Sequence, residues 1–304
     1  MSDMSSLTLG EHVPSPVVTG KPRQIADGVY VIPDGRVPLV PNIGIILGDR
    51  AALVVDTGFG PRSGAHAHDA AKELAGDRQL LVTLTHFHPE HGFGAQAFTD
   101  ATLLYNRTQH DEFRQKAAGY LEQFRGFSED AAHELEGVEF VDPQIVYDAG
   151  CDVDLGGRIV QIRSRGPAHS CGDQTIYLPA ERILFAGDLV ENRFLPILPY
   201  FPPYDVDVDG QRWMEVLDEL KEMQPEIVVP GHGELGGTEV IDAYHTYIQW
   251  LESETLRLAG EGKAPEEIIS TLTPLVFERY ADWDLEPWRV ATAVQSFLAR
   301  TTQA

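Results

Sequence analysis

Along the chain, short runs of β-branched and other apolar residues alternate with segments in which apolar residues recur every three or four positions. Two such runs in residues 42–58 flank the polar pair Asp49-Arg50, which predicts a β-hairpin. Between residues 211 and 223 the apolar positions follow the i, i+3, i+4, i+7 spacing of an amphipathic helix. By the same criteria we expect further strands at 28–33, 80–85, 144–148, 152–164, 174–179, 182–186 and 226–233, and further helices at 62–76, 107–136, around 241–251 and in the tail at 264–301.

The order of these elements is rich in strands at first and then mixed, with helices following strands. Such an order favours an α/β sandwich over a single parallel sheet. No linker composition divides the chain, so we expect one domain over residues 25–304, with a C-terminal helical extension that begins at about residue 237. Residues 1–24 are expected to form a loosely ordered leader.

Composition narrows the range of partners. The chain has 304 residues and a formal net charge of −24, and such a surface repels nucleic acid. No apolar stretch reaches the roughly 18 to 20 residues that span a bilayer, so no membrane partner is expected. The N-terminus lacks the pattern of a secretory signal, and only Cys151 and Cys171 occur, which together favour a reducing cytoplasm. The sequence is also compatible with a homodimer.

The stretch "LVTLTHFHPEHGFG" (81–94) crowds His86, His88, Glu90 and His91 at the end of a predicted strand. Alternation along an extended segment puts His86 and His88 on the same side. Pro89 then ends the strand, so Glu90 and His91 can turn back toward them. Imidazole suits zinc, iron and manganese, and a carboxylate adds neutralising charge. The motif therefore predicts part of a metal site.

Three downstream loops offer the remaining ligands that such a site needs. "GPAHSCGD" (166–173) supplies His169, "LFAGDLV" (184–190) supplies Asp188, and "VVPGHGE" (228–234) supplies His232. Each residue stands in a glycine-bearing loop next to a predicted strand, where functional residues tend to lie.

This ordered series resembles the metallo-β-lactamase-fold hydrolases, whose pattern is His-x-His-x-Asp-His, a lone His, a bridging Asp and a final His. "VVDTG" (54–58) also matches a recurrent family element, and the resemblance places Asp56 near the metals, as a partner of their ligands. The resemblance implies an αββα sandwich of two mixed β-sheets flanked by helices, with two zinc ions. It assigns one metal to His86, His88 and His169, the second to Glu90, His91 and His232, and Asp188 to both.

Glu90 departs from the family pattern, which usually has Asp at this position. The added methylene matters against metal-site tolerances of about 0.2 Å. The second site could adjust its backbone, bind iron or manganese, bind more weakly or stay empty. Near His169, Asp173 either orients a ligand imidazole or serves the turn, and Cys171 is either a small turn residue or a thiolate that tunes the site.

The resemblance implies hydrolysis by a metal-activated hydroxide, with Asp188 as the catalytic residue that orients the nucleophile. The bond would be an ester, thioester, lactone or amide. The first alternative is a mononuclear iron oxidoreductase similar to the thiol or persulfide dioxygenases of the family. The others are a β-lactamase-type amide hydrolase and a binding protein with a structural metal.

The segment after Asp188, "ENRFLPILPYFPPYDVD" (191–207), is rich in proline and aromatic residues and therefore predicts a loop. Its position beside a candidate ligand favours the wall of an apolar substrate pocket, with core packing or a dimer contact as the alternative. Residues 107–136 are a candidate for the opposite wall. We therefore expect a small-molecule substrate with an apolar or aromatic portion, bound by Phe194, Leu195, Tyr200, Phe201 and Tyr204.

Overall fold

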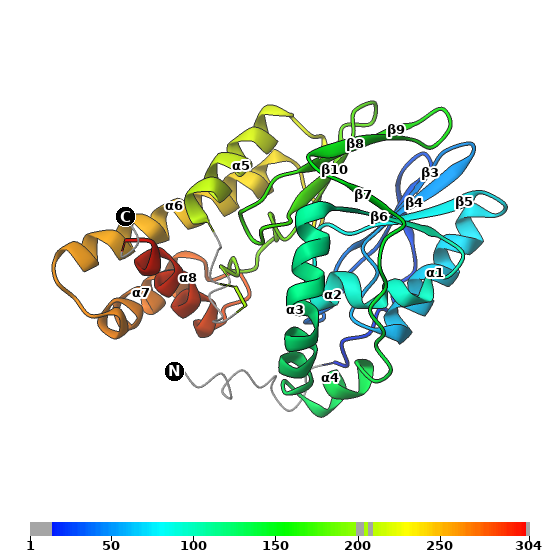
Figure 1. Ribbon diagram of the computed structural model, residues 1–304. Helices are drawn as coiled ribbons and strands as arrows, with labels where there is room; N and C mark the ends of the chain where they lie inside the picture. The colour runs from blue at the N-terminus through cyan, green and yellow to red at the C-terminus, as the bar shows by residue number, and fades with distance from the viewer. Residues whose placement is uncertain (1–13, 199–203, 206–208, 302–304) are drawn as a thin grey trace.

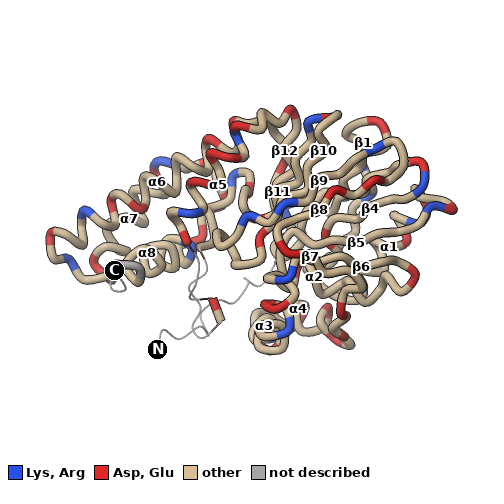
Figure 2. The backbone as a smooth tube through the Cα atoms, turned by 45° about the horizontal axis from the view of Figure 1, so that its top comes forward, with Lys and Arg blue, Asp and Glu red and all other residues tan. Residues whose placement is uncertain are grey.

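The computed structural model describes residues 14–198, 204–205 and 209–301. Two β-sheets pack together, and helices cover both outer faces (Figure 1). Among the described residues, no helix combines the length and the apolar character needed to cross a membrane. Acidic positions occur both on the sheet-bearing half and along the C-terminal helices, so the negative charge is not confined to one segment (Figure 2).

The first sheet contains seven strands in chain order. Its first four strands pair antiparallel, and its last four pair parallel. The hairpin expected at Asp49-Arg50 is present between the third and fourth strands. The strands are β1 (Arg23–Ala26), β2 (Val29–Ile32), β3 (Ile43–Leu47), β4 (Ala51–Val55), β5 (Gln79–Thr83), β6 (Thr102–Asn106) and β7 (Ile145–Tyr147).

The second sheet contains five strands in the order β12-β11-β10-β9-β8, of which only β11 and β12 pair parallel. Apolar side chains from both sheets, such as Val55 and Ile162, form the core between them. Both sheets are therefore mixed, as expected. The strands are β8 (Gly150–Asp154), β9 (Ile159–Ser164), β10 (Gln174–Leu178), β11 (Ile183–Gly187) and β12 (Ile227–Pro230).

The helices form the two outer layers. Alanines on one face of α1, such as Ala67 and Ala71, pack on the outer face of the first sheet. The second sheet is covered by α5 and α6, and Trp213 is fully buried there. The helices are α1 (Pro61–Ala75), α2 (Pro89–Gly92), α3 (Arg107–Arg125), α4 (Glu129–Glu134), α5 (Gly210–Glu222), α6 (Thr238–Gly260), α7 (Pro265–Arg279) and α8 (Pro287–Thr301), with a 3₁₀ turn at Phe93–Ala97.

Helices α6, α7 and α8 extend to one side of the sandwich, as Figure 1 shows. They share one apolar core with α5, to which Tyr244, Leu272 and Phe297 contribute. The helical extension expected from about residue 237 thus starts at Thr238. Its core is continuous with the layer that covers the second sheet.

The elements differ from expectation in three places. The single strand expected at 152–164 is two strands, because Gly156 and Gly157 adopt positive φ and form a tight turn. Strands β1 and β6 were missed because they are short and partly polar. Residues 14–24 of the expected leader are not loosely attached: Val18 is buried, and its N–H donates to Ser63 Oγ at 3.0 Å.

Candidate metal centre

The histidine motif is shaped by the end of β5 and the short helix α2. His86 and His88 lie in the short segment between β5 and α2, and Pro89 takes the first position of α2. Proline suits that position because its missing N–H has no partner in a helix anyway. The single helical turn then brings Glu90 and His91 back toward the two histidines, and all four side chains are buried.

The other candidate ligands come from the second sheet. His169 lies in the loop before β10, Asp188 directly follows β11, and His232 follows β12. Because β11 and β12 are parallel neighbours, their ends present Asp188 and His232 side by side. Gly231 keeps this approach close, since a Cβ there would collide with the Asp188 carboxylate. The cluster therefore forms only where the two sheets meet.

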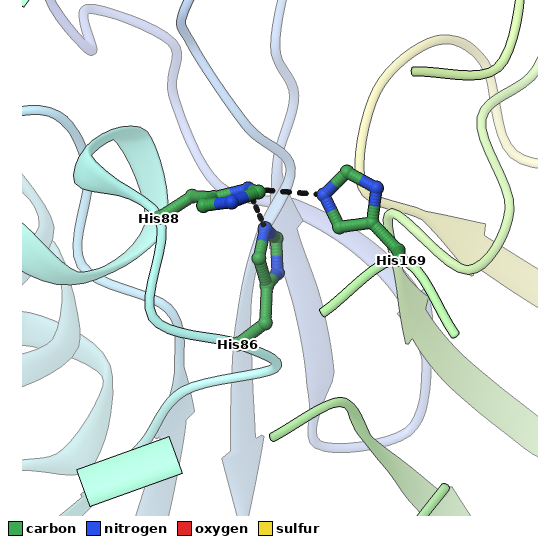
Figure 3. Close-up of side chains that lie close together, drawn as sticks. All are labelled: His86, His88 and His169. Atoms are coloured by element: carbon green, nitrogen blue, oxygen red, sulfur yellow. Dashed lines mark hydrogen bonds between the residues drawn. The ribbon is translucent and has the colours of Figure 1, made fainter. Parts of the chain in front are cut away.

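Three imidazoles turn one nitrogen each toward a common point (Figure 3). Nε2 of His86 and Nε2 of His169 each lie 3.0 Å from Nδ1 of His88. Three nitrogens bound to one zinc at about 2.0–2.1 Å in tetrahedral geometry would be about 3.3 Å apart. The observed spacing is thus close to what a single ion requires.

The second group consists of Glu90, His91, Asp188 and His232, whose candidate ligand atoms lie within 4.8 Å of one another. Asp188 also adjoins the first group. Its Oδ1 lies 3.2 Å from Nε2 of His91, and its Oδ2 lies 3.7 Å from Nε2 of both His169 and His232. The geometry brings all seven expected residues together, with Asp188 between the two groups.

Several buried polar atoms in this cluster lack hydrogen-bond partners within the described part of the chain. They are Glu90 Oε2, His91 Nε2 and both carboxylate oxygens of Asp188. His91 Nε2 and Asp188 Oδ1 lie close enough for an ion pair, but leaving such groups without hydrogen bonds in the interior costs on the order of several kcal/mol. Cations would satisfy the carboxylates and imidazole lone pairs together, so this donor set fits divalent metal.

Each candidate imidazole is held at its other nitrogen by a neighbouring oxygen. Such contacts fix the tautomer and leave the inward nitrogen as an acceptor. Asp56, expected from "VVDTG", has this role for His91 and also accepts from the backbone N–H of Thr85 at 2.6 Å. The contacts are His86 Nδ1 to Thr85 Oγ1 (3.1 Å), His88 Nε2 to Asp205 Oδ2 (3.3 Å), His91 Nδ1 to Asp56 Oδ2 (2.9 Å), His169 Nδ1 to the Ile197 carbonyl (3.0 Å) and His232 Nδ1 to the Val40 carbonyl (3.0 Å).

The electrostatics of the cluster keep its inward nitrogens unprotonated at two positions. Burial lowers the pKa of His169 to about 3, and burial together with the neighbouring His91 lowers the pKa of His86 well below its ordinary value. Burial alone would raise the pKa of Asp188, but His91 and His232 outweigh it and hold that pKa well below the usual range. The Asp188 carboxylate is therefore anionic, as a metal ligand must be.

Comparison with known protein families shows which family this chain belongs to. The family model of the metallo-beta-lactamase superfamily matches residues 36–232, a span that includes every candidate ligand. The chain belongs to the metallo-beta-lactamase superfamily. The resemblance inferred from the ordered histidines is thereby confirmed.

Relatives and solved structures agree with this membership. An acyl-coenzyme A thioesterase from Gallus gallus is 30% identical over 65% of this chain and 74% of its own length. A type 2 metallo-beta-lactamase from Bacteroides fragilis is 33% identical over 33% of this chain and 40% of its own length. A structure of a family protein from Thermus thermophilus matches over 92% of this chain and 95% of its own, with a TM-score of 0.65 at 19% identity. The expected αββα sandwich of the superfamily is confirmed.

Asp173 and Cys171 belong to the turn that carries His169. Asp173 accepts from the backbone N–H and the hydroxyl of Ser170, both at 2.7 Å, whereas the outer nitrogen of His169 faces the Ile197 carbonyl. Asp173 thus acts on the turn, and the expected contact with an imidazole is replaced by a backbone contact. Cys171 is half-buried, and its backbone N–H points at Glu112 Oε1 at 3.3 Å.

The residues expected to line the substrate pocket divide into three groups. Tyr200 and Phe201 lie outside the described residues. Leu195 was wrongly expected to face a ligand: it is fully buried in the core shared by α5, α6 and α8. Phe194 and Tyr204 stay beside the metal centre, Phe194 with its ring 6.2 Å from that of His232 and Tyr204 against α3.

One contact of the metal centre had no signal in the sequence. Asp205 holds His88, yet it is one of three alternating aspartates in "YDVDVDG" (204–210), and nothing in that pattern distinguishes it. Its ion-pair partner Lys116 lies in α3 among other charged residues, and charge on a helix usually faces solvent.

Glu90 offers a direct test of the second group of ligands. We expect Glu90→Gln to lower the affinity for the second equivalent of metal at least about tenfold. Loss of an outer partner of a ligand already costs about that much, and loss of a charged ligand should cost no less. The first equivalent should bind as before, since Glu90 is not part of the three-histidine group. Stepwise calorimetric titration of the metal-free protein measures both.

Glu90→Asp is the matched control, since it keeps the charge and restores the usual family residue. It should retain the second equivalent. Equal weakening of both equivalents in Glu90→Gln would contradict the assignment.

Proposed function

We propose that this superfamily member is a metal-dependent hydrolase that cleaves an ester, thioester, lactone or amide bond in a substrate with an apolar portion. One observation carries the proposal: two groups of buried ligands adjoin each other, and the carboxylate of Asp188 lies between them. Zinc is the proposed metal at both, because imidazole and carboxylate donors in small clusters suit it.

Bound divalent ions would supply a water of lowered pKa and Lewis-acid stabilisation of a developing oxyanion. The protein contributes position and charge. Asp188 is anionic and lies between the groups, so its oxygens can accept a hydrogen bond from the attacking water and orient it. The outer contacts of the five imidazoles keep the site preorganised, which lowers the entropic barrier to reaction.

Aromatic side chains near the metal centre support an apolar substrate. The partly buried ring of Tyr204 packs 5.7 Å from the core residue Tyr120, whose ring lies 5.4 Å from that of His88. Phe194 borders His232 at another point of the cluster. An apolar wall around a few polar groups is typical of small-molecule sites. The thioesterase relative is consistent with a thioester as one member of this substrate class.

The mononuclear iron oxidoreductase is less well supported. A single-ion enzyme needs no second group of converging ligands, whereas Glu90, His91, Asp188 and His232 converge beside the first. Elemental analysis of protein purified without added metal separates the two. Two zinc ions per chain favour the hydrolase, and one redox-active iron favours the oxidoreductase.

A panel of acyl esters and acyl thioesters with chains of increasing length tests the substrate class. We expect kcat/KM to rise by up to about fourfold for each added methylene that is buried, which corresponds to about 0.8 kcal/mol. Protein stripped with a chelator should lose turnover and regain it when zinc is restored. A flat or falling trend with chain length would remove the apolar substrate, and activity unaffected by metal removal would remove the metal mechanism.

A further inference from the structure

A cluster of three buried charged side chains lies next to the metal centre. The Lys116 ammonium donates to Glu112 Oε1 at 2.7 Å and to Asp205 Oδ1 at 3.0 Å. The side chains are only 10%, 7% and 1% exposed, respectively. Burying three charges is costly unless each is paired, and a stable fold does not need such a cluster when apolar residues could fill the space. Its position therefore invites a functional explanation.

The cluster contacts both segments that build the three-histidine group. Asp205 Oδ2 lies 3.3 Å from Nε2 of His88, so the proton stays on Nε2 and Nδ1 faces His86 and His169. Glu112 accepts from the backbone N–H of Gly172 at 2.6 Å, in the turn that carries His169. One helix, α3, thus contacts both the carboxylate that holds His88 and the turn that carries His169, through side chains at i and i+4.

The surface of α3 is shaped for these contacts. A Cβ on Gly172 would collide with the backbone of Gln109 near the start of α3. Only glycine at position 172 therefore lets the turn that carries His169 pack this closely against α3. A Cβ on Gly119 would collide with the ring of Tyr204, the residue before Asp205. Neither glycine has positive φ, so close packing is the reason for both. Asp205 is thereby set directly over Lys116.

We propose that Lys116 is a positioning residue, which holds Asp205 on His88 and Glu112 on the His169 turn and so sets the geometry of the three-histidine metal site. Its ammonium contacts Glu112 and Asp205, and neither is among the seven candidate metal ligands. The inference rests on the proposed function, because it assumes that this group binds a catalytic ion. It also links the loop after Asp188 to that ion, since Asp205 belongs to the loop.

The test is titration of the metal-free protein with Co²⁺, which reports ligand geometry through its visible absorption. We expect Lys116→Met to weaken one equivalent of Co²⁺ by about 10- to 100-fold, the range for outer partners of metal ligands, and to change the absorption bands of that equivalent. In a hydrolytic assay kcat should fall more than KM rises, because the proposed role of Lys116 acts through the metal site and not through substrate binding.

Arg158→Met is the matched control. Arg158 forms a similarly shielded ion pair with Glu181 at 2.8 Å, in the second sheet and outside the metal centre. The Arg158→Met variant should leave the Co²⁺ affinity and the absorption spectrum unchanged. This result would separate a positioning role of Lys116 from the general effect of losing an ion pair. If Lys116→Met does not fold, Asp205→Asn replaces it, since the amide keeps the shape and removes the charge that Lys116 holds.

Wild-type affinity and an unchanged spectrum in a folded Lys116→Met protein, or in Asp205→Asn where that variant replaces it, would overturn the proposal. The readout is independent of the substrate. A wild-type protein that binds Co²⁺ but hydrolyses nothing would defeat the proposed function alone, whereas unaltered binding in the variant would defeat only the role of Lys116.

Discussion

Replacing Asp188 with alanine should lower kcat/KM at least about a thousandfold, a loss of about 4 kcal/mol in transition-state stabilisation. The reason is its location: its two oxygens lie within 4 Å of nitrogens from His86, His91, His169 and His232. In the proposed mechanism, removing the carboxylate takes away the ligand that both metal sites would share and the acceptor that would orient the attacking water. Steady-state kinetics with added zinc measures the loss, and elemental analysis shows how much metal is retained.

Asp188→Asn is the matched control for volume. The amide fills the same space against Gly231 but carries no charge, so its activity should fall by a similar factor if charge is what matters. Circular dichroism should show the fold intact in both variants. Full turnover in either would rule out a bridging role for Asp188.

Replacing Arg289 with methionine should destabilise the protein by about 3–5 kcal/mol, because it leaves a buried carboxylate without its partner. Arg289 in α8 pairs with Glu191 at 3.1 Å, and both side chains are at least nine-tenths shielded from solvent. Arg289 also donates to the Leu195 carbonyl at 2.7 Å, so the helical extension holds the segment that follows Asp188. Denaturant unfolding measures the change in free energy.

Two further variants give this prediction its controls. Glu191→Gln combined with Arg289→Met should recover part of the loss, because no buried charge then lacks a partner. Arg257→Met removes a guanidinium that is 51% exposed and pairs with Glu254 and Glu261, so it should leave the stability nearly unchanged. Equal effects of Arg257→Met and Arg289→Met would show that α8 is not held by the buried pair.

The sequence was most informative for the metal ligands, because histidines and acids in this pattern point to one kind of chemistry. Five histidines and two acids in a fixed order predicted a common cluster, and the structure brings all seven together. The hairpin at Asp49-Arg50 followed from two apolar runs around a polar pair, and helix α5 followed from apolar positions at helical spacing. These features depend on local pattern or on ligand chemistry, both of which can be read along the chain.

Features that depend on packing between distant segments were not predictable in this way. Leu195 lies in an aromatic, proline-rich loop, and its burial depends on helices more than ten residues further along the chain. Asp205 meets His88 across 117 positions, and no periodicity links the two. The pair of Gly156 and Gly157 was a local signal for a turn that the β-branched runs around it concealed.

The division of the ligands between the two sheets has a consequence for how the polypeptide matures. His86 and His91 leave the ribosome well before Asp188 and His232, and no high-affinity cage exists until the halves have docked. Binding of metal by all seven side chains would therefore require the two sheets to be packed together, and its free energy would add to the stability of the folded sandwich.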